Sequence, residues 1–169
     1  MNTFVIVHGA WAGGWFFQET ARFLRAAGHE VYTPTLTGIG ERVHLGHPDI
    51  DLDTHIQDIV NVLEYEDLED VSLVGYSYGG MVVTGVAERV PERIKQLIYL
   101  DAFVPVDGQS LADIMVSMGQ DMKDWNMGEQ WGEEGAYNLL RVIAYNIKQT
   151  ENSIREYRTV LARLGVDEP

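Results

Sequence analysis

The sequence reads Val71-Ser72-Leu73-Val74-Gly75-Tyr76-Ser77-Tyr78-Gly79-Gly80 near its middle. An apolar, β-branched run ends in a glycine, and apolar residues at helical spacing follow from Met81 to Ala87. This order predicts a strand, a sharp turn and a helix, with the Ser77 hydroxyl at the tip of the turn. The Gly-x-Ser-x-Gly spacing is typical of a nucleophile elbow, whose strained serine leaves no room for side chains two positions either way.

The composition indicates one acidic domain with a sizeable core. Of the 169 residues, 46% are apolar, and 26 acidic against 12 basic residues give a formal net charge of −14. This charge disfavours nucleic-acid and anionic-membrane partners. The absence of cysteine excludes disulfides, a thiol nucleophile and a thiolate metal site. With no leader pattern and no apolar run near the ~18 residues that span a bilayer, we expect a soluble, cytoplasmic protein.

Strands and helices are predicted to alternate along the chain. The predicted strands are Thr3–Val7, Glu30–Tyr32, the run from Val71 to the elbow, and Ile94–Asp101. The predicted helices cover 16–27, with Gly28 as the terminating glycine, 51–63 and the segment from Met81 to Pro91. A loop is expected over 35–48. The alternation predicts an α/β fold with a doubly wound, mainly parallel sheet of about four strands.

The composition changes after about Leu111. Methionine and tryptophan lie among glycine and acidic residues, and apolar residues at helical spacing follow over 136–147 and 153–164. Because methionine adapts to varied apolar ligands, we expect a helical cap over a pocket. One compact domain is therefore predicted, with a core over residues 1–111 and a cap-like segment over residues 112–169.

Two glycine-rich turns are predicted at the carboxyl ends of strands, where doubly wound sheets form their sites. One holds Ser77, and the other is His8-Gly9-Ala10-Trp11-Ala12-Gly13-Gly14. An acyl-transfer site needs a nucleophile and two amides aimed at the developing oxyanion. Tyr78 can supply one amide and the turn after Val7 the other. A phosphate-binding loop is the weaker interpretation of that turn, because it lacks Gly-x-Gly-x-x-Gly spacing and any lysine.

Four motifs occur in order: Phe4-Val-Ile-Val-His-Gly-Ala-Trp-Ala-Gly-Gly-Trp15, Tyr32-Thr-Pro-Thr-Leu-Thr-Gly-Ile-Gly-Glu-Arg-Val-His-Leu45, Leu52-Asp-Thr-His-Ile56 and Gly75-Tyr-Ser-Tyr-Gly-Gly-Met-Val82. Together they resemble the α/β-hydrolase superfamily, especially its small bacterial esterase-like members akin to plant hydroxynitrile lyases and methyl-ester esterases. The resemblance implies that Ser77 is the nucleophile and that the Ala10 and Tyr78 amides form the oxyanion hole. Trp11 either lines the pocket mouth or only packs. A small-molecule ester substrate is implied, with no cofactor and no metal.

The chain departs from the family pattern in its histidines. The family order is serine, acid and then histidine, but no histidine follows His55. His8 resembles the family's structural histidine beside the oxyanion turn. The chain has four other histidines, His29, His44, His47 and His55, and none of the five matches the catalytic position. Asp101 is expected to be structural, or else to act as the acid from an alternative position. Without a base, a serine hydroxyl is a poor nucleophile.

The family's strand order places Ile94–Asp101 at the edge of a four-stranded sheet. An apolar edge strand with unpaired backbone groups is a liability that folded proteins usually cover. In complete family members, two further strands follow and carry the acid and the histidine. We expect the chain to be a fragment of a larger hydrolase. Alternatively, a partner or a second copy in a homo-oligomer supplies the missing strands, or a minimal fold has lost catalysis.

Three functions are compatible with these residues. The first is a serine hydrolase that acts on small carboxylic esters through an acyl-enzyme on Ser77. The second is a hydroxynitrile-lyase-like reaction at the same site. The third is a non-catalytic homologue that binds an apolar ligand, favoured by the missing histidine. A metal site formed by His44, His47 and His55 is a remote alternative, because the histidines show no His-Glu-x-x-His pattern.

Overall fold

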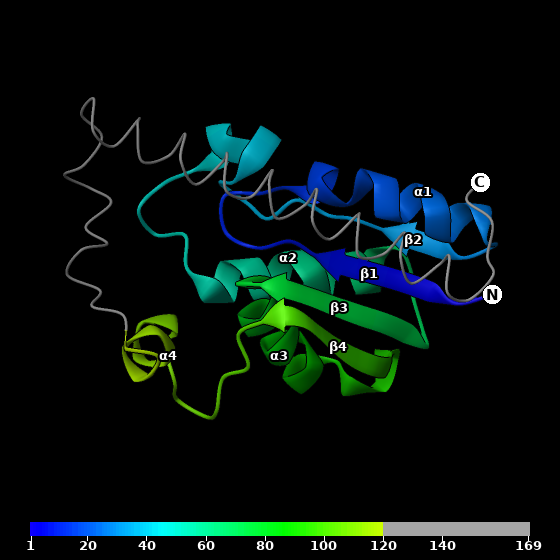
Figure 1. The fold of residues 1–169 in the computed structure, drawn as a ribbon. Coiled ribbons are helices and arrows are strands. Elements are labelled where there is room, and N and C mark those ends of the chain that lie inside the picture. Colours follow the sequence, from blue (N-terminus) through cyan, green and yellow to red (C-terminus); the bar gives the residue numbers. More distant parts are fainter. Residues whose placement is uncertain (120–169) are drawn as a thin grey trace. The chain divides into compact units, whose positions relative to one another are not determined.

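The computed structural model describes residues 1–119 (Figure 1). The chain divides into two units, Met1–Gln120 and Asp121–Pro169, and the described residues belong to the first. The predicted helices over 136–147 and 153–164, and with them the helical cap, lie outside the described residues. The boundary between residues 1–111 and 112–169 stays a prediction.

Four parallel strands form the sheet, as the alternation of elements predicts. In spatial order they are β2 (Glu30–Tyr32), β1 (Thr3–Val7), β3 (Val71–Ser77) and β4 (Ile94–Ala102) (Figure 1). β1 and β3 each pair with a strand on both sides, and most of their apolar residues are buried. The predicted α/β fold with a parallel sheet is confirmed.

α-Helices and 3-10 helices lie between the strands, and a last short helix follows β4. In chain order the helices are the 3-10 helix η1 (Gly14–Phe17), α1 (Gln18–Ala26), the 3-10 helix η2 (Gly40–Leu45), α2 (Leu52–Tyr65), α3 (Gly79–Arg89), the 3-10 helix η3 (Pro91–Arg93) and α4 (Leu111–Ser117).

Within residues 1–119, none of the helices combines the length and the apolar character needed to cross a membrane. The cytoplasmic location stays a prediction.

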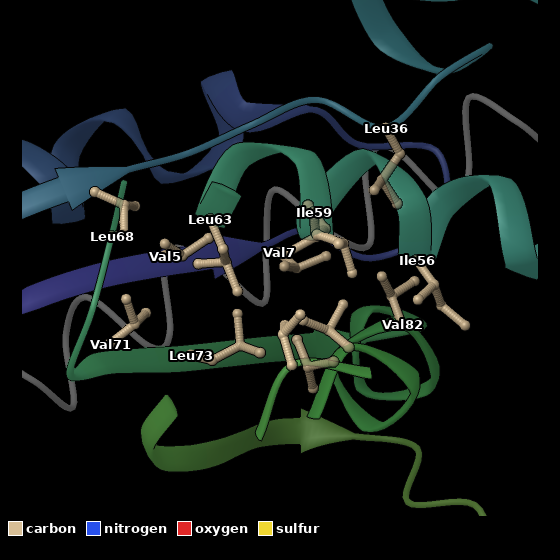
Figure 2. Packing of buried hydrophobic residues seen from close by; sticks show 14 residues of the cluster. Val5, Val7, Leu36, Ile56, Ile59, Leu63, Leu68, Val71, Leu73 and Val82 are labelled. Atoms are coloured by element: carbon tan, nitrogen blue, oxygen red, sulfur yellow. The ribbon is translucent and has the colours of Figure 1, made fainter. Parts of the chain in front are cut away.

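Two apolar layers enclose the sheet. Along β1, Val5 and Val7 belong to one cluster and Ile6 to the other, as the two-residue period of a strand requires. The cluster of Val5 and Val7 includes buried residues of α2 and α3 and is drawn in Figure 2. The Ile6 cluster includes residues of η1 and α1. Because helices cover both faces, the central strands are continuous apolar runs without polar alternation.

Capping signals fix the helix ends that the sequence indicates. Gly28 follows α1 in the left-handed region, with φ 85°, and its amide donates to the Arg25 carbonyl. α2 begins after Asp51, whose carboxylate accepts from the Thr54 amide at 2.9 Å in a capping box. The end of α1 agrees with the prediction from Gly28, and the start of α2 agrees with the helix predicted from residue 51.

The expected loop over 35–48 is wrong for Gly40–Leu45, which form η2. None of these six residues is buried, so no apolar periodicity marks the helix. α4 was not predicted either, because its seven residues are too few to establish a helical period. Its start does carry a signal, since Ser110 and Asp113 form a capping box.

β4 is the edge strand of the sheet that residues 1–119 form, at the position the family order implies. Leu97 and Tyr99 pack against the α2 and α3 cluster, whereas Leu100 is 48% exposed. The pairing of β4 with β3 shifts register twice, once near Val71 and once at Ser77. That a further segment or a second copy covers this edge stays a prediction.

Candidate active site

The backbone at Ser77 is left-handed. Its φ is 53°, a region that residues with a Cβ seldom occupy. Ser77 is the last residue of β3, Tyr78 has helical angles, and α3 begins at Gly79. The predicted sequence of strand, turn and helix is therefore present, with the strain concentrated at the serine.

The glycines around Ser77 are needed for two different reasons. A Cβ on Gly75 would lie 2.6 Å from Val83 Cγ2 and 2.7 Å from the Gly79 carbonyl oxygen, which is the collision across the turn that the spacing predicts. A Cβ on Gly79 would instead lie 2.5 Å from the carbonyl oxygen of Val7. The second glycine thus allows the start of α3 to approach the end of β1, a requirement that the spacing alone does not reveal.

The turn after β1 lies directly beside Ser77. β1 and β3 are paired neighbours in the sheet, so their carboxyl ends meet at one edge (Figure 1). A Cβ on Gly9 would lie 2.9 Å from Ser77 Cβ. The two glycine-rich turns that the sequence singles out are therefore in contact.

His8 fixes the direction of the amide after Gly9. The ring is fully buried, and its Nε2 accepts a hydrogen bond from the Leu36 amide at 3.0 Å. In the neutral ring the proton is then on Nδ1, which donates to the Gly9 carbonyl at 2.7 Å. Because the peptide group is planar and trans, a fixed Gly9 carbonyl also fixes the opposite direction of the Ala10 N–H. Burial lowers the pKa of His8 and keeps the ring neutral.

His55 holds the residue that follows the serine. Its Nε2–H donates to the Thr37 carbonyl at 3.0 Å, so Nδ1 accepts from the Tyr78 hydroxyl at 2.9 Å. Burial, and secondarily the charge of Asp51, raises the pKa of Tyr78 to about 12, so its hydroxyl keeps the proton at neutral pH. Sequence reasoning missed this role of His55. A usable signal was its place beside Ile56, within the helical pattern of the buried face of α2.

Two amides remain available next to the serine. Among residues 1–119, neither the Ala10 amide nor the Tyr78 amide donates a hydrogen bond. Tyr78 precedes the first turn of α3, where helix amides have no partner within the helix. A serine hydroxyl at the end of a buried strand, with two such amides in the adjoining turns, is suited chemically to acyl transfer.

In the described part of the chain, none of the five histidines is bonded to the Ser77 hydroxyl. All five histidines lie within residues 1–119, and in that part of the chain no side chain forms a hydrogen bond with the Ser77 hydroxyl. His29 accepts from the Asn2 amide at 3.2 Å, next to the amino-terminal end of β1. His44 lies in η2 and His47 follows it. In the same part of the chain, no three acidic or histidine side chains gather to hold a metal ion.

Asp101 lies in a bulge beside the serine. Tyr76 pairs with Leu100 and Ser77 with Ala102, so Asp101 is left over between the two pairs, with φ 44°. The Asp101 side chain is exposed. Burial of Tyr76, and secondarily the charge of Asp101, raises the pKa of Tyr76. The candidate acid is thus next to the elbow in the sheet pairing, and its role stays a prediction.

Trp11 follows Ala10 in the turn after β1. Its φ is 58° and its side chain is 48% exposed. A second exposed aromatic residue, Trp15, lies four positions further on. That Trp11 lines a substrate pocket stays a prediction.

Comparisons with known proteins identify the family of this chain. A model of the alpha/beta hydrolase family matches residues 4–164, and the chain belongs to that family. It is 56% identical over 115 residues to the carbendazim hydrolyzing esterase of Nocardioides sp. (strain SG-4G), covering 68% of this chain and 48% of the relative. It is 32% identical over 103 residues to an alpha-hydroxynitrile lyase of Arabidopsis thaliana, covering 60% and 40%.

A solved structure shows the same fold. It is an extracellular alpha/beta-hydrolase from a Paenibacillus species, described as sharing structural and functional homology with tobacco Salicylic Acid Binding Protein 2. The TM-score is 0.63 at 42% identity, over 67% of this chain and 46% of the other. The chain therefore spans less than half the length of these three relatives. The predicted resemblance to esterase-like α/β hydrolases is confirmed.

Replacing Gly75 by alanine should destabilise the protein by about 2–3 kcal/mol, because the new methyl group overlaps Val83 and the Gly79 carbonyl. Gly28→Ala is the matched control. Its methyl group meets nothing within 4 Å, so only the left-handed backbone opposes it, at about 1 kcal/mol. Urea unfolding measures both changes. A loss in Gly75→Ala no larger than in Gly28→Ala contradicts the steric account.

Acidification should weaken the fold through His8. Because burial lowers the pKa of His8 in the folded state, the unfolded chain binds a proton near pH 6.5 that the folded chain does not. Stability is therefore present above pH 6.5 and falls below it, by up to about 1.4 kcal/mol per pH unit. Urea unfolding at pH 7.5 and 5.5 should show a larger loss for the wild type than for His8→Gln. Equal losses contradict a buried neutral ring.

Proposed function

We propose that this chain carries the nucleophile and the oxyanion hole of a serine hydrolase for small carboxylic esters. The proposal rests on the left-handed Ser77, which contacts the turn of Gly9, and on the Ala10 and Tyr78 amides, which donate no hydrogen bond within residues 1–119. Membership of the α/β hydrolase family and the esterase among its relatives support hydrolysis as the reaction.

In the proposed reaction, Ser77 Oγ attacks the carbonyl carbon of the ester and gives up its proton. The carbonyl oxygen becomes an oxyanion that accepts hydrogen bonds from the Ala10 and Tyr78 amides. When the tetrahedral intermediate collapses, the alcohol leaves with a proton and the acyl group stays on Oγ. Water then attacks the acyl-enzyme and releases the acid, which restores the serine hydroxyl.

Proton removal is the demanding step for this chain. His8 and His55 each use both ring nitrogens in hydrogen bonds to other groups, and no histidine follows His55. We assign the removal of the Ser77 proton in this chain to solvent. Loss of a triad member leaves a reaction of about 10³–10⁴-fold over water in related sites, which is the scale of acceleration expected here.

Trp11 is the residue that we propose for contact with the substrate. The residue belongs to the turn that carries Ala10, so its exposed ring is close in sequence to the proposed oxyanion donor. We propose that it contacts the acyl or alcohol group of a small ester. Neither a cofactor nor a metal is part of the proposed reaction.

Ser77→Ala tests the proposal. A fluorophosphonate should label Ser77 in the wild type, as seen by peptide mass spectrometry, and should not label the variant. Hydrolysis of p-nitrophenyl acetate should fall to the background of the buffer. Ser117→Ala is the matched control and should label as the wild type does, since Ser117 Oγ only donates to the Ile114 carbonyl in α4.

The same assay reports the source of the base. With solvent as proton acceptor, the logarithm of the labelling rate should rise with pH from 6 to 9 at a slope of about one, because the rate follows hydroxide. A plateau above pH 7 would indicate a histidine-like base and contradict solvent activation. Equal labelling of the wild type and Ser77→Ala contradicts the proposed function itself.

A lyase reaction at the same site is the second candidate, and the similarity to a hydroxynitrile lyase favours it. The reaction would cleave a cyanohydrin into a carbonyl compound and hydrogen cyanide. Release of benzaldehyde from mandelonitrile, without hydrolysis of p-nitrophenyl acetate, would favour the lyase over the esterase.

A non-catalytic ligand-binding protein is the third candidate. The unbonded Ser77 hydroxyl within residues 1–119 is the observation in its favour. Measurable binding of an apolar ligand without fluorophosphonate labelling would support this candidate.

A further inference from the structure

Two buried histidines meet the same short segment after β2. The Leu36 amide donates to His8 Nε2 at 3.0 Å, and His55 Nε2–H donates to the carbonyl of the next residue, Thr37, at 3.0 Å. The exposed fractions of the two rings are 0% and 7%. One dipeptide thus connects both rings.

The other ring nitrogens reach the two halves of the proposed oxyanion hole. His8 Nδ1 bonds to the Gly9 carbonyl, whose peptide group carries the Ala10 amide. His55 Nδ1 bonds to the hydroxyl of Tyr78, whose own amide is the second donor. The two rings therefore hold the two donors from one common support.

α2 holds that support in place. Asp58 accepts hydrogen bonds from the Thr37 amide at 2.7 Å and from the Thr37 hydroxyl at 2.8 Å. Arg42 lies 3.7 Å from the same carboxylate and donates to the Thr35 carbonyl at 2.7 Å. His55 is on α2 as well, one turn before Asp58, so helix and segment are joined at two successive points.

We propose that His55 is a positioning residue for the oxyanion hole, which sets the direction of the Tyr78 amide through the Tyr78 hydroxyl. The inference rests on the proposed function of Ser77. His55 contacts no reacting atom, because its nitrogens bond to Thr37 and Tyr78. Its ring also meets the Tyr78 ring edge to face, with centroids 5.7 Å apart.

The hydrogen bond matters because Tyr78 follows a strained residue. The peptide group between Ser77 and Tyr78 carries the donor amide, and Ser77 is left-handed. The Tyr78 carbonyl is held by the Met81 amide at 2.9 Å, and the far end of the side chain is held by His55. Without the hydrogen bond to His55 the Tyr78 ring can rotate, and the Tyr78 amide no longer points in a fixed direction toward the oxyanion.

Tyr78→Phe removes the anchor and keeps the amide, the ring and its volume. Saturation kinetics with diisopropyl fluorophosphate separate binding from reaction, because the phosphoryl oxygen needs the oxyanion hole only in the reaction. The maximal labelling rate of Ser77 should fall by about 10-fold with an unchanged inhibitor binding constant, less than the ~10²–10³-fold loss of a whole donor. A purely structural role would not produce this split.

Tyr99→Phe is the matched control. It removes another partly buried tyrosine hydroxyl, bonded to Thr84 Oγ1 at 2.7 Å, and should change the labelling rate less than two-fold. His55→Leu should lower the rate as Tyr78→Phe does, and the double variant should be no slower than either single variant.

The outcomes separate the two proposals. An unchanged maximal rate in Tyr78→Phe, or effects of the two substitutions that multiply, overturns the positioning role and leaves the proposed function intact. Equal labelling of the wild type and Ser77→Ala overturns both. If His55→Leu does not fold, Tyr78→Phe and Tyr99→Phe decide the question on their own.

Discussion

The left-handed backbone of Ser77 determines how β3, α3 and the end of β1 meet at the carboxyl edge of the sheet. With φ at 53°, the chain turns from β3 into α3 within two residues, which brings the start of α3 against the end of β1. That approach is possible only because Gly79 has no Cβ, and the turn itself only because Gly75 has none. The strand order then puts Gly9 beside Ser77, so that a hydroxyl and two amides share one edge of the sheet.

A strained turn keeps its conformation only if its surroundings determine it. Here the determination comes from buried hydrogen bonds as much as from apolar packing. His8 and His55 connect the two turns to Leu36 and Thr37, and every nitrogen of the two rings is used. A buried polar network whose hydrogen bonds are all made fixes one arrangement of its members, because removing any partner leaves a buried polar group without a hydrogen bond and destabilises the fold. His8 and His55 therefore support the two turns of the proposed site and use their ring nitrogens in doing so.

The strands, the elbow and the two glycine-rich turns at the carboxyl ends of strands are predictable from the sequence, because each has a local signal: an apolar run or a glycine spacing. The bonds from Leu36 to His8 and from His55 to Thr37 join residues 28 and 18 positions apart, and no spacing encodes them. The bulge at Asp101 is a property of the pairing of two strands, which one strand cannot reveal. The role of Gly79 likewise depended on β1, which only the folded sheet brings near.

A crystal structure of the protein after reaction with a fluorophosphonate would show whether the Ala10 and Tyr78 amides form the oxyanion hole of Ser77. We expect phosphorus bonded to Ser77 Oγ, with the phosphoryl oxygen about 3 Å from the backbone nitrogens of both Ala10 and Tyr78. A phosphoryl oxygen that points to solvent, or that accepts hydrogen bonds from other groups and from neither amide, would contradict this oxyanion hole.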